Sequence, residues 1–306
     1  MGEGIMNGRM GEWARGNVDF LSLIPPISHS STPSFPHRTF SCSEIMSMFD
    51  FAVQLAREAG QLLRDHLGRV IGVSHKSSTL DLVTEVDLLS EQYIKEKIAT
   101  HYPKHQILAE ESGYQKADSE YRWLVDPLDG TTNYAHGYPC FAVSIALERS
   151  GEILLGVVYD PMHEELFAAE RGSGAMLNGR PIHVSRISRL SDSLLVTGFP
   201  YNVRTNPASI EYFARFMNNA QAVRRDGSAA LDMCYVACGR FDGFWEMGLN
   251  PWDMAAGRLI IEEAGGRVTK FDGRPFDIYD PEVLASNGLI HGEMMAVLTN
   301  GRPQTV

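Results

Sequence analysis

The sequence predicts a mixed fold in two parts, an α+β part followed by an α/β part. Two patterns carry this prediction. Helical periodicity in the first ordered segments gives way to five strand-like segments in quick succession, which favours two helices on an antiparallel-rich sheet. From Leu194 onward, strand-like and helical segments alternate, which is typical of a smaller α/β layer.

The first expected helix carries an apolar stripe over residues 52–63 and ends at Gly68. The run 75–87 is polar at first and then strand-like, and a second helix is expected over residues 88–100. Strand signals then follow at 106–109, 121–125, 141–147, 153–159 and 165–169.

The Asn178-Gly179 pair favours a hairpin turn after the last of these strands. A domain boundary is expected within 185–191, which divides the ordered chain into domains of residues 46–187 and 188–306. In the second domain, helices are expected near 210–217, 229–237 and 253–264.

Length and composition bound the class of protein. The 306 residues suffice for one large or two moderate domains, and 44% hydrophobic with 21% charged residues is ordinary for a soluble globular chain. The formal net charge of −11 argues against a general nucleic-acid binder, which needs a basic face. Four cysteines without zinc-type spacing favour a reducing, cytoplasmic setting, and no apolar run predicts a membrane span.

Residues 1–45 differ from the rest because they are rich in Ser and Pro and lack helical or strand periodicity. Three interpretations are open: a disordered tail, a transit peptide, or a mis-assigned start with Met46 or Met48 as the true first residue. Acidic residues in this stretch fit a transit peptide poorly. The third interpretation is favoured, and mass spectrometry that finds residues before Met46 in the native protein would overturn it.

Acidic residues gather at the ends of the predicted elements rather than on charged helical faces. The apolar run 123–125 is followed by Asp126, Pro127, Asp129 and Gly130, which are not expected to continue a strand. Hard divalent cations such as Mg²⁺ take oxygen ligands, and carboxylates gathered without a cation repel one another. The pattern therefore indicates a multi-metal site. The other acidic residues in this pattern are Asp81 with Asp87, Glu110 with Glu111, and Asp253.

Each cluster also has an ordinary structural interpretation. Asp87 can cap the following helix, and Asp253 can complement the dipole of its own helix. The glutamate pair fits an exposed loop. Asp126 and Asp129 are harder to explain in this way, because a turn needs one Asp or Asn at most.

Three motifs occur in a fixed order: AEES at 109–112, WLVDPLDGTTN at 123–133 and PWDMAAGRLIIEEAGG at 251–266. Together they resemble the inositol monophosphatase family of Mg²⁺-dependent, lithium-sensitive phosphatases, above all its bacterial members, over residues 46–300. The resemblance implies a layered αβαβα sandwich of the sugar phosphatase type, two to three Mg²⁺ ions and a homodimer. It also implies hydrolysis of inositol monophosphate, or of a related polyol or sugar phosphate, by attack of metal-activated water.

The same resemblance implies the metal ligands. Glu110, Asp126 and the backbone carbonyl of Leu128 would hold the first Mg²⁺. Asp126, Asp129 and Asp253 would hold the second ion, and Glu110 would also assist a weaker third ion.

The resemblance further implies the catalytic and substrate-binding residues. Thr131 and Asp87 would position and deprotonate the attacking water, with Glu111 beside the third ion. The loop 75–78 matches a mobile segment of the family near that ion. Substrate contacts are implied for Gly130, Thr131, Gly227, Ser228, Ala229, Glu246 and Asp253.

Alternatives remain for substrate and for class. The sequence DGTT at 129–132, where relatives acting on 3'-phosphoadenosine 5'-phosphate or histidinol phosphate carry DGTK, favours a polyol or sugar phosphate. Fructose 1,6-bisphosphate, alone or as a dual activity, is the runner-up substrate. An alternative of another class is a protein-binding regulatory partner in transcription. No nucleophile elbow is found, and Gly172-Ser173-Gly174 lacks the Lys end of a P-loop.

Overall fold

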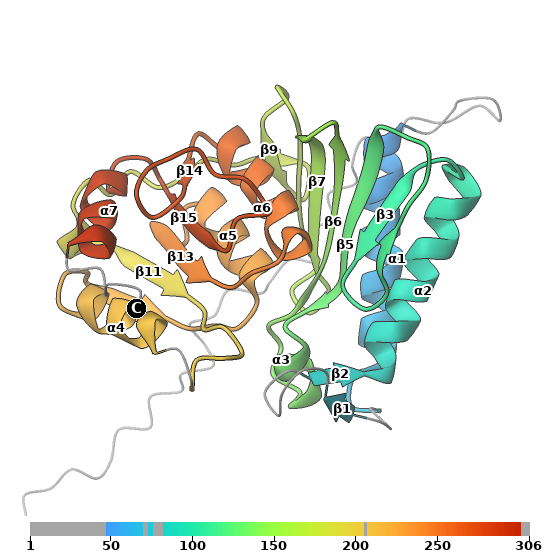
Figure 1. Ribbon diagram of the computed structural model, residues 1–306, viewed down its shortest axis with the longest axis horizontal. Coiled ribbons are helices and arrows are strands. Elements are labelled where there is room, and N and C mark those ends of the chain that lie inside the picture. The colour runs from blue at the N-terminus through green and yellow to red at the C-terminus, as the bar shows by residue number, and fades with distance from the viewer. Residues whose placement is uncertain (1–46, 70–72, 76–81, 205–206, 301–306) are drawn as a thin grey trace, which may run out of the picture. The chain divides into compact units, whose positions relative to one another are not determined.

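The computed structural model describes residues 47–69, 73–75, 82–204 and 207–300. The expected tail at 1–45 lies outside these ranges, as does most of the loop 75–78. Figure 1 shows five layers in the order helix, sheet, helix, sheet, helix, which confirms the predicted αβαβα arrangement. The helices of these layers are α1 (Met48–His66) and α2 (Glu85–His101), then α5 (Ala229–Ala237) and α6 (Pro251–Glu263), then α4 (Ala208–Met217) and α7 (His291–Thr299).

The larger sheet has eight strands in the order β10-β9-β8-β7-β6-β5-β3-β4. Every neighbouring pair is antiparallel except β3 with β5, so the predicted antiparallel-rich sheet is confirmed. Its strands are β3 (Gln106–Ala109), β4 (Gly113–Gln115), β5 (Tyr121–Asp129), β6 (Ala142–Arg149), β7 (Glu152–Asp160), β8 (Glu165–Glu170), β9 (Ala175–Leu177) and β10 (Arg180–Pro181).

The smaller sheet has five strands in the order β12-β11-β13-β15-β14. Strand β11 runs parallel to β12 and β13, whereas β15 is antiparallel to both of its neighbours. Its strands are β11 (Leu194–Thr197), β12 (Ala222–Arg224), β13 (Gly243–Met247), β14 (Arg267–Thr269) and β15 (Glu282–Ser286).

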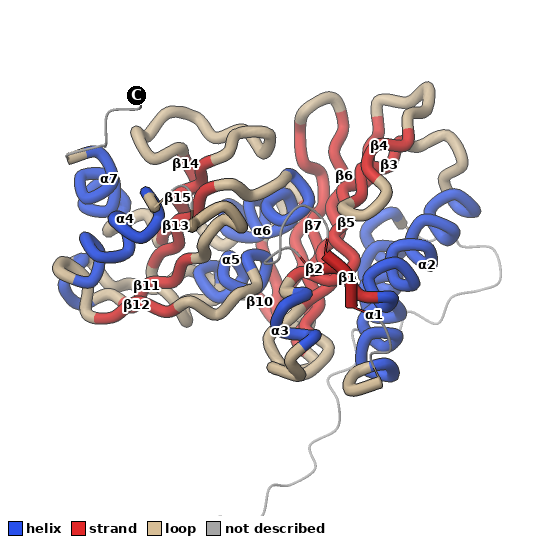
Figure 2. Tube along the Cα trace, turned by 60° about the horizontal axis from the view of Figure 1, so that its bottom comes forward, coloured by secondary structure: helices blue, strands red, loops and turns tan. Residues whose placement is uncertain are grey.

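Three short elements lie near the ends of the central strands. Strands β1 (Val73–His75) and β2 (Leu82–Thr84) form an antiparallel pair, and α3 (Thr131–Ala135) follows β5 directly. Helix α3 contacts β2, as can be followed in Figure 2. The predicted hairpin is confirmed, because Asn178 and Gly179 have positive φ values of 50° and 75° between β9 and β10.

Strand β5 corrects one prediction. It does not end at Val125 but continues through Pro127 to Asp129. The register with β6 shifts between Asp126 and Asp129, and this bulge accommodates Pro127, which has no N–H to donate to the ladder. The carbonyl of Pro127 accepts a hydrogen bond of 3.0 Å from the buried Ser90 hydroxyl on α2, which holds the bulge in place.

Helix α2 also begins earlier than predicted, at Glu85 rather than Leu88. Thr84 is its N-cap, and the Asp87 side chain accepts a hydrogen bond of 2.8 Å from the Thr84 N–H, which completes a capping box. Asp87 therefore takes part in capping, but as the third residue of the helix and not as the N-cap expected before Leu88. This does not exclude a second role for the same carboxylate.

Helices α5 and α6 fill the space between the two sheets and place residues from both in one apolar core. The largest buried cluster includes Leu124 and Phe167 of the eight-stranded sheet together with Phe244 of the five-stranded sheet and Ala256 of α6. The expected boundary at residue 187 falls between β10 and β11, and the division into two domains stays a prediction.

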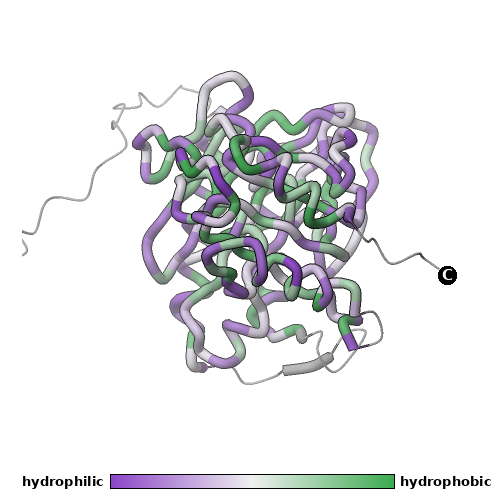
Figure 3. Tube along the Cα trace, turned by 90° about the vertical axis from the view of Figure 1, so that its left-hand side faces the viewer, coloured by the Kyte–Doolittle hydropathy of each residue, from purple (hydrophilic) through white to green (hydrophobic). Residues whose placement is uncertain are grey.

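Hydropathy alternates along the chain rather than rising over one long segment (Figure 3). Within the described ranges, none of the helices has both the length and the apolar character needed to cross a bilayer.

Candidate active site

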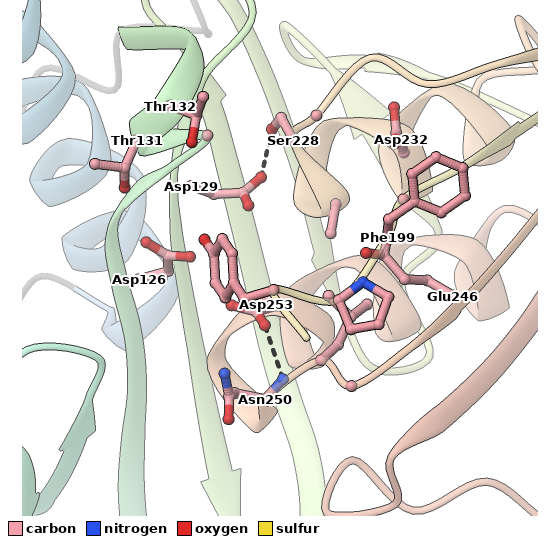
Figure 4. Close-up of a pocket in the computed structure, with 18 of the residues that line it drawn as sticks. Asp126, Asp129, Thr131, Thr132, Phe199, Ser228, Asp232, Glu246, Asn250 and Asp253 are labelled. Atoms are coloured by element: carbon pink, nitrogen blue, oxygen red, sulfur yellow. Dashed lines mark hydrogen bonds between the residues drawn. The ribbon is translucent and has the colours of Figure 1, made fainter. Parts of the chain in front are cut away.

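The predicted acids meet where β3 and β5 end. Glu110 directly follows β3, and Asp126 and Asp129 lie in the last part of β5. Because β3 and β5 are parallel neighbours, their carboxyl ends lie next to each other at the same end of the strands. Asp253 reaches the same place from the first turn of α6, and all four residues line one pocket. Figure 4 shows Asp126, Asp129 and Asp253 in this pocket.

Backbone N–H groups hold two of these carboxylates. Asp126 accepts a hydrogen bond of 3.0 Å from the Leu128 N–H across the bulge. Asp253 accepts one of 2.7 Å from the Asn250 N–H and so caps its own helix. The dipole role considered for Asp253 therefore accompanies its place in the pocket.

Asp129 is held by the N-terminus of α5. Its Oδ2 accepts a hydrogen bond of 2.9 Å from the Ala230 N–H and another from the Ser228 hydroxyl, which also caps α5. Donors at a helix N-terminus stabilise the ionised carboxylate. The Ser228 segment thus positions an acid of the cluster from the other half of the chain.

Burial raises the pKa of Asp126 well above its ordinary range, and the charges of Glu110, Asp129 and Asp253 raise it further. Burial likewise raises the pKa of Asp253, and it raises that of Asp129 to about 6. Asp126 lies within hydrogen-bonding reach of both Glu110 and Asp253, so these acids face one another directly. Because like charges repel, these carboxyl groups are not expected to be ionised all at once unless a positive charge lies among them.

The donor set of this cluster is made only of oxygen atoms, which is what Mg²⁺ prefers. No three His, Cys, Asp or Glu side chains in the described ranges already have the arrangement of a metal site. Instead, the carboxylates are engaged by protein donors and by one another. By donor chemistry and charge the residues fit hard divalent cations.

Thr131 and Asp87 form a buried pair beside these acids. The Thr131 hydroxyl lies 3.0 Å from Asp87 Oδ1 and 3.1 Å from the Leu128 carbonyl oxygen, so it can donate to either. Burial raises the pKa of Asp87. Gly130 precedes Thr131 with φ of 95°, and a β-carbon there would lie 2.9 Å from the Cys140 carbonyl oxygen. Glycine is therefore needed for the turn that brings Thr131 to Asp87.

Glu111 is arranged differently from its neighbour Glu110. It is half-buried and does not line the pocket, whereas Glu110 does. Its N–H donates a hydrogen bond of 2.7 Å to the buried carboxylate of Glu91 on α2. The structure therefore places the Glu111 backbone against α2, and the role of its side chain at a third ion stays a prediction.

The remaining predicted substrate contacts line the same pocket. Gly227, Ser228 and Ala229 line it together with Glu246 of β13. Burial raises the pKa of Glu246 to about 8. A β-carbon on Gly198 would collide with the Glu246 carboxylate, so glycine is needed there for this side chain to lie in the pocket.

Several lining residues were missed by reasoning from the sequence, namely Phe199, Tyr201, Arg225 and Asp232. For Asp232 a signal exists, because it is the only charged residue in the otherwise apolar helix AALDMCYVA. Such a buried charge in the first turn of an apolar helix calls for an explanation. The other three lie in or beside turns and carry no comparable signal.

A family model for the inositol monophosphatase family matches residues 44–302. The chain belongs to the inositol monophosphatase family. It is therefore a member of a family of phosphatases, and three relatives show the range of names within it. It is 46% identical over 261 residues to an inositol-1-monophosphatase of Synechocystis sp., covering 85% of this chain and 91% of the relative. It is 43% identical over 253 residues to the Nus factor SuhB of Escherichia coli, covering 81% and 94%. It is 40% identical over 253 residues to a fructose-1,6-bisphosphatase/inositol-1-monophosphatase of Thermotoga maritima, covering 83% and 96%.

The fold is shared with solved members of the family. An inositol monophosphatase structure from Anabaena (Nostoc) sp. PCC 7120 is 47% identical and has a TM-score of 0.76, covering 84% of this chain and 96% of that chain. The predicted fold class is thus confirmed by structure as well as by sequence.

Proposed function

We propose that this family member is a Mg²⁺-dependent phosphomonoesterase that hydrolyses inositol monophosphate or a related polyol phosphate. The observation that carries the proposal is one pocket that joins two kinds of residue. At one end lie Glu110, Asp126, Asp129 and Asp253 beside the Thr131 hydroxyl, and at the other end lies the buried carboxyl of Glu246. The first end suits a phosphate with cations, and the second suits an alcohol group with several hydroxyls.

The residues proposed to hold two Mg²⁺ ions are Glu110, Asp126, Asp129, Asp253 and the carbonyl of Leu128. When bound, divalent cations supply positive charge that neutralises the phosphate and lowers the pKa of water. The chain supplies the fixed carboxylates and the closed surroundings that keep them together.

Thr131 and Asp87 are proposed to handle the proton of the attacking water. The Thr131 hydroxyl accepts the hydrogen bond of a water molecule while it donates to Asp87 Oδ1, which lies 3.0 Å away. Asp87 is suited to take a proton because burial raises its pKa. Its other oxygen is held by the Thr84 N–H at 2.8 Å, so the carboxylate cannot rotate away from Thr131.

The test is release of inorganic phosphate with Mg²⁺ from inositol 1-phosphate, fructose 1,6-bisphosphate and 3'-phosphoadenosine 5'-phosphate. We expect inositol 1-phosphate to give the highest kcat/KM. Asp126→Asn should lower turnover by at least about 100-fold with the fold kept, because it removes charge beside the reacting phosphate. Near-normal turnover of Asp126→Asn at saturating Mg²⁺, or hydrolysis of the adenosine bisphosphate alone, would contradict the proposal.

Fructose 1,6-bisphosphate is the alternative substrate, alone or as a second activity. The relative from Thermotoga maritima, whose name combines both activities, supports including it in the panel. A kcat/KM for the bisphosphate equal to or above that for inositol 1-phosphate would favour this alternative.

A second candidate function is that of a protein-binding partner in transcription. The name of the Escherichia coli relative, a Nus factor, supports this candidate. The net charge of −11 favours contact with protein rather than direct contact with nucleic acid. Pull-down from host extract with natural protein and Asp126→Asn separates the two functions, because retention of a transcription protein by an inactive variant would show both.

Homodimer formation, cytoplasmic location and inhibition by lithium belong to the same proposal, since they follow from the family likeness. Sedimentation equilibrium checks the first, fractionation of host cells the second, and phosphate release with LiCl the third. A monomer at micromolar concentration, a membrane-bound pool or insensitivity to lithium would each remove one of these attributes.

A further inference from the structure

Asp232 is a buried acid for which the described part of the chain provides no hydrogen-bond donor. Its side chain is 1% exposed, and neither carboxyl oxygen has a hydrogen-bond partner. Leaving a buried polar group unpaired costs about 1–3 kcal/mol, and more for a charged group. A folded protein rarely keeps such a group without a use for it.

The position of Asp232 indicates that it faces the part of the pocket where the alcohol group of a phosphate ester would lie. It lies in the first turn of α5, one turn after Ser228, whose hydroxyl binds Asp129 of the acid cluster. It lines the same pocket, on the side of Phe199 and Glu246 and away from Asp126 (Figure 4). A ligand whose phosphate lies at the acid cluster would extend its alcohol group toward this side.

The charges at this side of the pocket decide the chemistry of the ligand. Asp232 and Glu246 are both acids. Burial and the charge of Glu246 raise the pKa of Asp232, and the charge of Arg225 opposes this rise only in part. Arg225 is the only Lys or Arg among the described residues that line the pocket, and its guanidinium lies 6.0 Å from the centre of the Phe199 ring. Two acids favour neutral hydroxyl donors and oppose a second phosphate.

Other uses of Asp232 fit the observations less well. It shares no hydrogen bond with the proposed cation ligands, and α5 binds Asp129 through Ser228 and Ala230 rather than through Asp232. It does not cap α5, since that role belongs to Ser228. The donors that Asp232 lacks in the protein are therefore best supplied by a bound ligand.

We propose that Asp232 is a specificity-determining residue that, together with Glu246, accepts hydrogen bonds from hydroxyl groups of the alcohol part of the substrate. The inference rests on the proposed phosphomonoesterase function. It narrows the substrate class to phosphomonoesters of polyols whose far side carries hydroxyl groups rather than a second phosphate.

The kinetic test compares substrates with and without those hydroxyls. Natural enzyme, Asp232→Asn and Asp232→Leu are assayed with inositol 1-phosphate and with phenyl phosphate. We expect KM for inositol 1-phosphate to rise by about tenfold or more in both variants, because Asp232→Leu removes both acceptor oxygens and Asp232→Asn replaces one of them with an NH2 donor. KM for phenyl phosphate should stay within about twofold, since it presents no hydroxyl to this side.

A stability readout separates this role from a merely structural one. Without ligand, both Asp232 variants should melt higher than the natural protein, by about 2–4 °C per kcal/mol gained, because they remove an unpaired buried acid. Asp242→Asn is the matched control. Asp242 is also buried but accepts hydrogen bonds from the Ser185 hydroxyl and from the Leu194 N–H, at 2.5 and 2.7 Å. Its substitution should lower the melting temperature and leave the ratio of the two KM values unchanged.

The outcomes separate failure of this inference from failure of the proposed phosphatase function. Two results would overturn the inference alone. One is an equal rise in KM for both substrates in the Asp232 variants. The other is a lower melting temperature of these variants, as expected if Asp232 instead formed an ion pair with Arg225. Absence of phosphate release by the natural enzyme from either substrate would overturn the proposed function and the inference with it.

Discussion

Acidification should destabilise the protein through His291, the first residue of α7. The ring is 0% exposed, and its two nitrogens each lie 2.8 Å from a hydroxyl, that of Thr269 for Nε2 and that of Ser286 for Nδ1. The Thr269 hydroxyl donates to the Lys270 carbonyl at 2.7 Å, so it accepts from Nε2–H. Nδ1 then accepts from the Ser286 hydroxyl, which assigns a neutral ring with its proton on Nε2.

The magnitude follows from the pKa of this ring. Burial lowers the pKa of His291 from 6.5 to about 4, and the charge of Arg267 lowers it further in the same direction. A histidine whose pKa is depressed by folding takes up its proton more readily when unfolded. Its contribution to stability is therefore complete above the unfolded pKa of 6.5 and is lost as the pH falls toward 4. The full loss amounts to about 3 kcal/mol.

Urea unfolding of natural protein and His291→Gln at about pH 7.5 and about pH 4.5 measures this loss. Comparing the two proteins at each pH cancels the titration of the buried carboxyls, which they share. We expect the stability advantage of the natural protein to shrink by about 2 kcal/mol or more between the two pH values. An advantage that is the same at both would refute the assignment of a neutral, buried His291.

Three further predictions concern the site and its support. Thr131→Val should lower kcat for phosphate release by about 100-fold, whereas Thr131→Ser should keep most activity, because only a hydroxyl can link the attacking water to Asp87. An equal loss of kcat in the two variants would contradict this. A β-carbon at Gly156 would lie 2.7 Å from the Ala256 Cα, so Gly156→Ala should destabilise by about 1–3 kcal/mol in urea, whereas Gly292→Ala, with open space around it, should not. Mg²⁺ at about 100 times its Kd should stabilise the natural protein by about 2.7 kcal/mol, and a melting curve of Asp126→Asn that shifts equally would show that the ion binds elsewhere.

Part of the fold follows from local sequence signals. The helix at 229–237 has the bounds predicted for it, because Ser228 is a strong N-cap and the residues after it form an apolar run. Strand β5 was predicted too short, because Pro127 ordinarily ends a strand and the bulge that tolerates it depends on pairing with β6. Several short strands of the five-stranded sheet carry too few residues to show a period of their own, and the tertiary pairing defines them.

The acids of the site could be named because each stands at the end of an apolar element, where a charge is conspicuous. Their hydrogen bonds could not be predicted, since Ser228 meets Asp129 only through the packing of α5 against the larger sheet. Asp232 could not be predicted as a site residue, because it does not stand at the end of an apolar element. Helical spacing alone does not show whether a single acid in an apolar helix faces solvent, a core or a pocket.

The residues of the pocket come from segments far apart in the chain, from Glu110 just after β3 to Glu246 of β13 and Asp253 of α6. No local stretch can assemble the acid cluster, because Asp253 reaches it only when α6 has docked on the eight-stranded sheet. Contacts between segments so distant in sequence form late in folding. Recovery of cation binding during refolding should therefore lag behind recovery of helix content, which makes the bound ion a reporter of the final docking step.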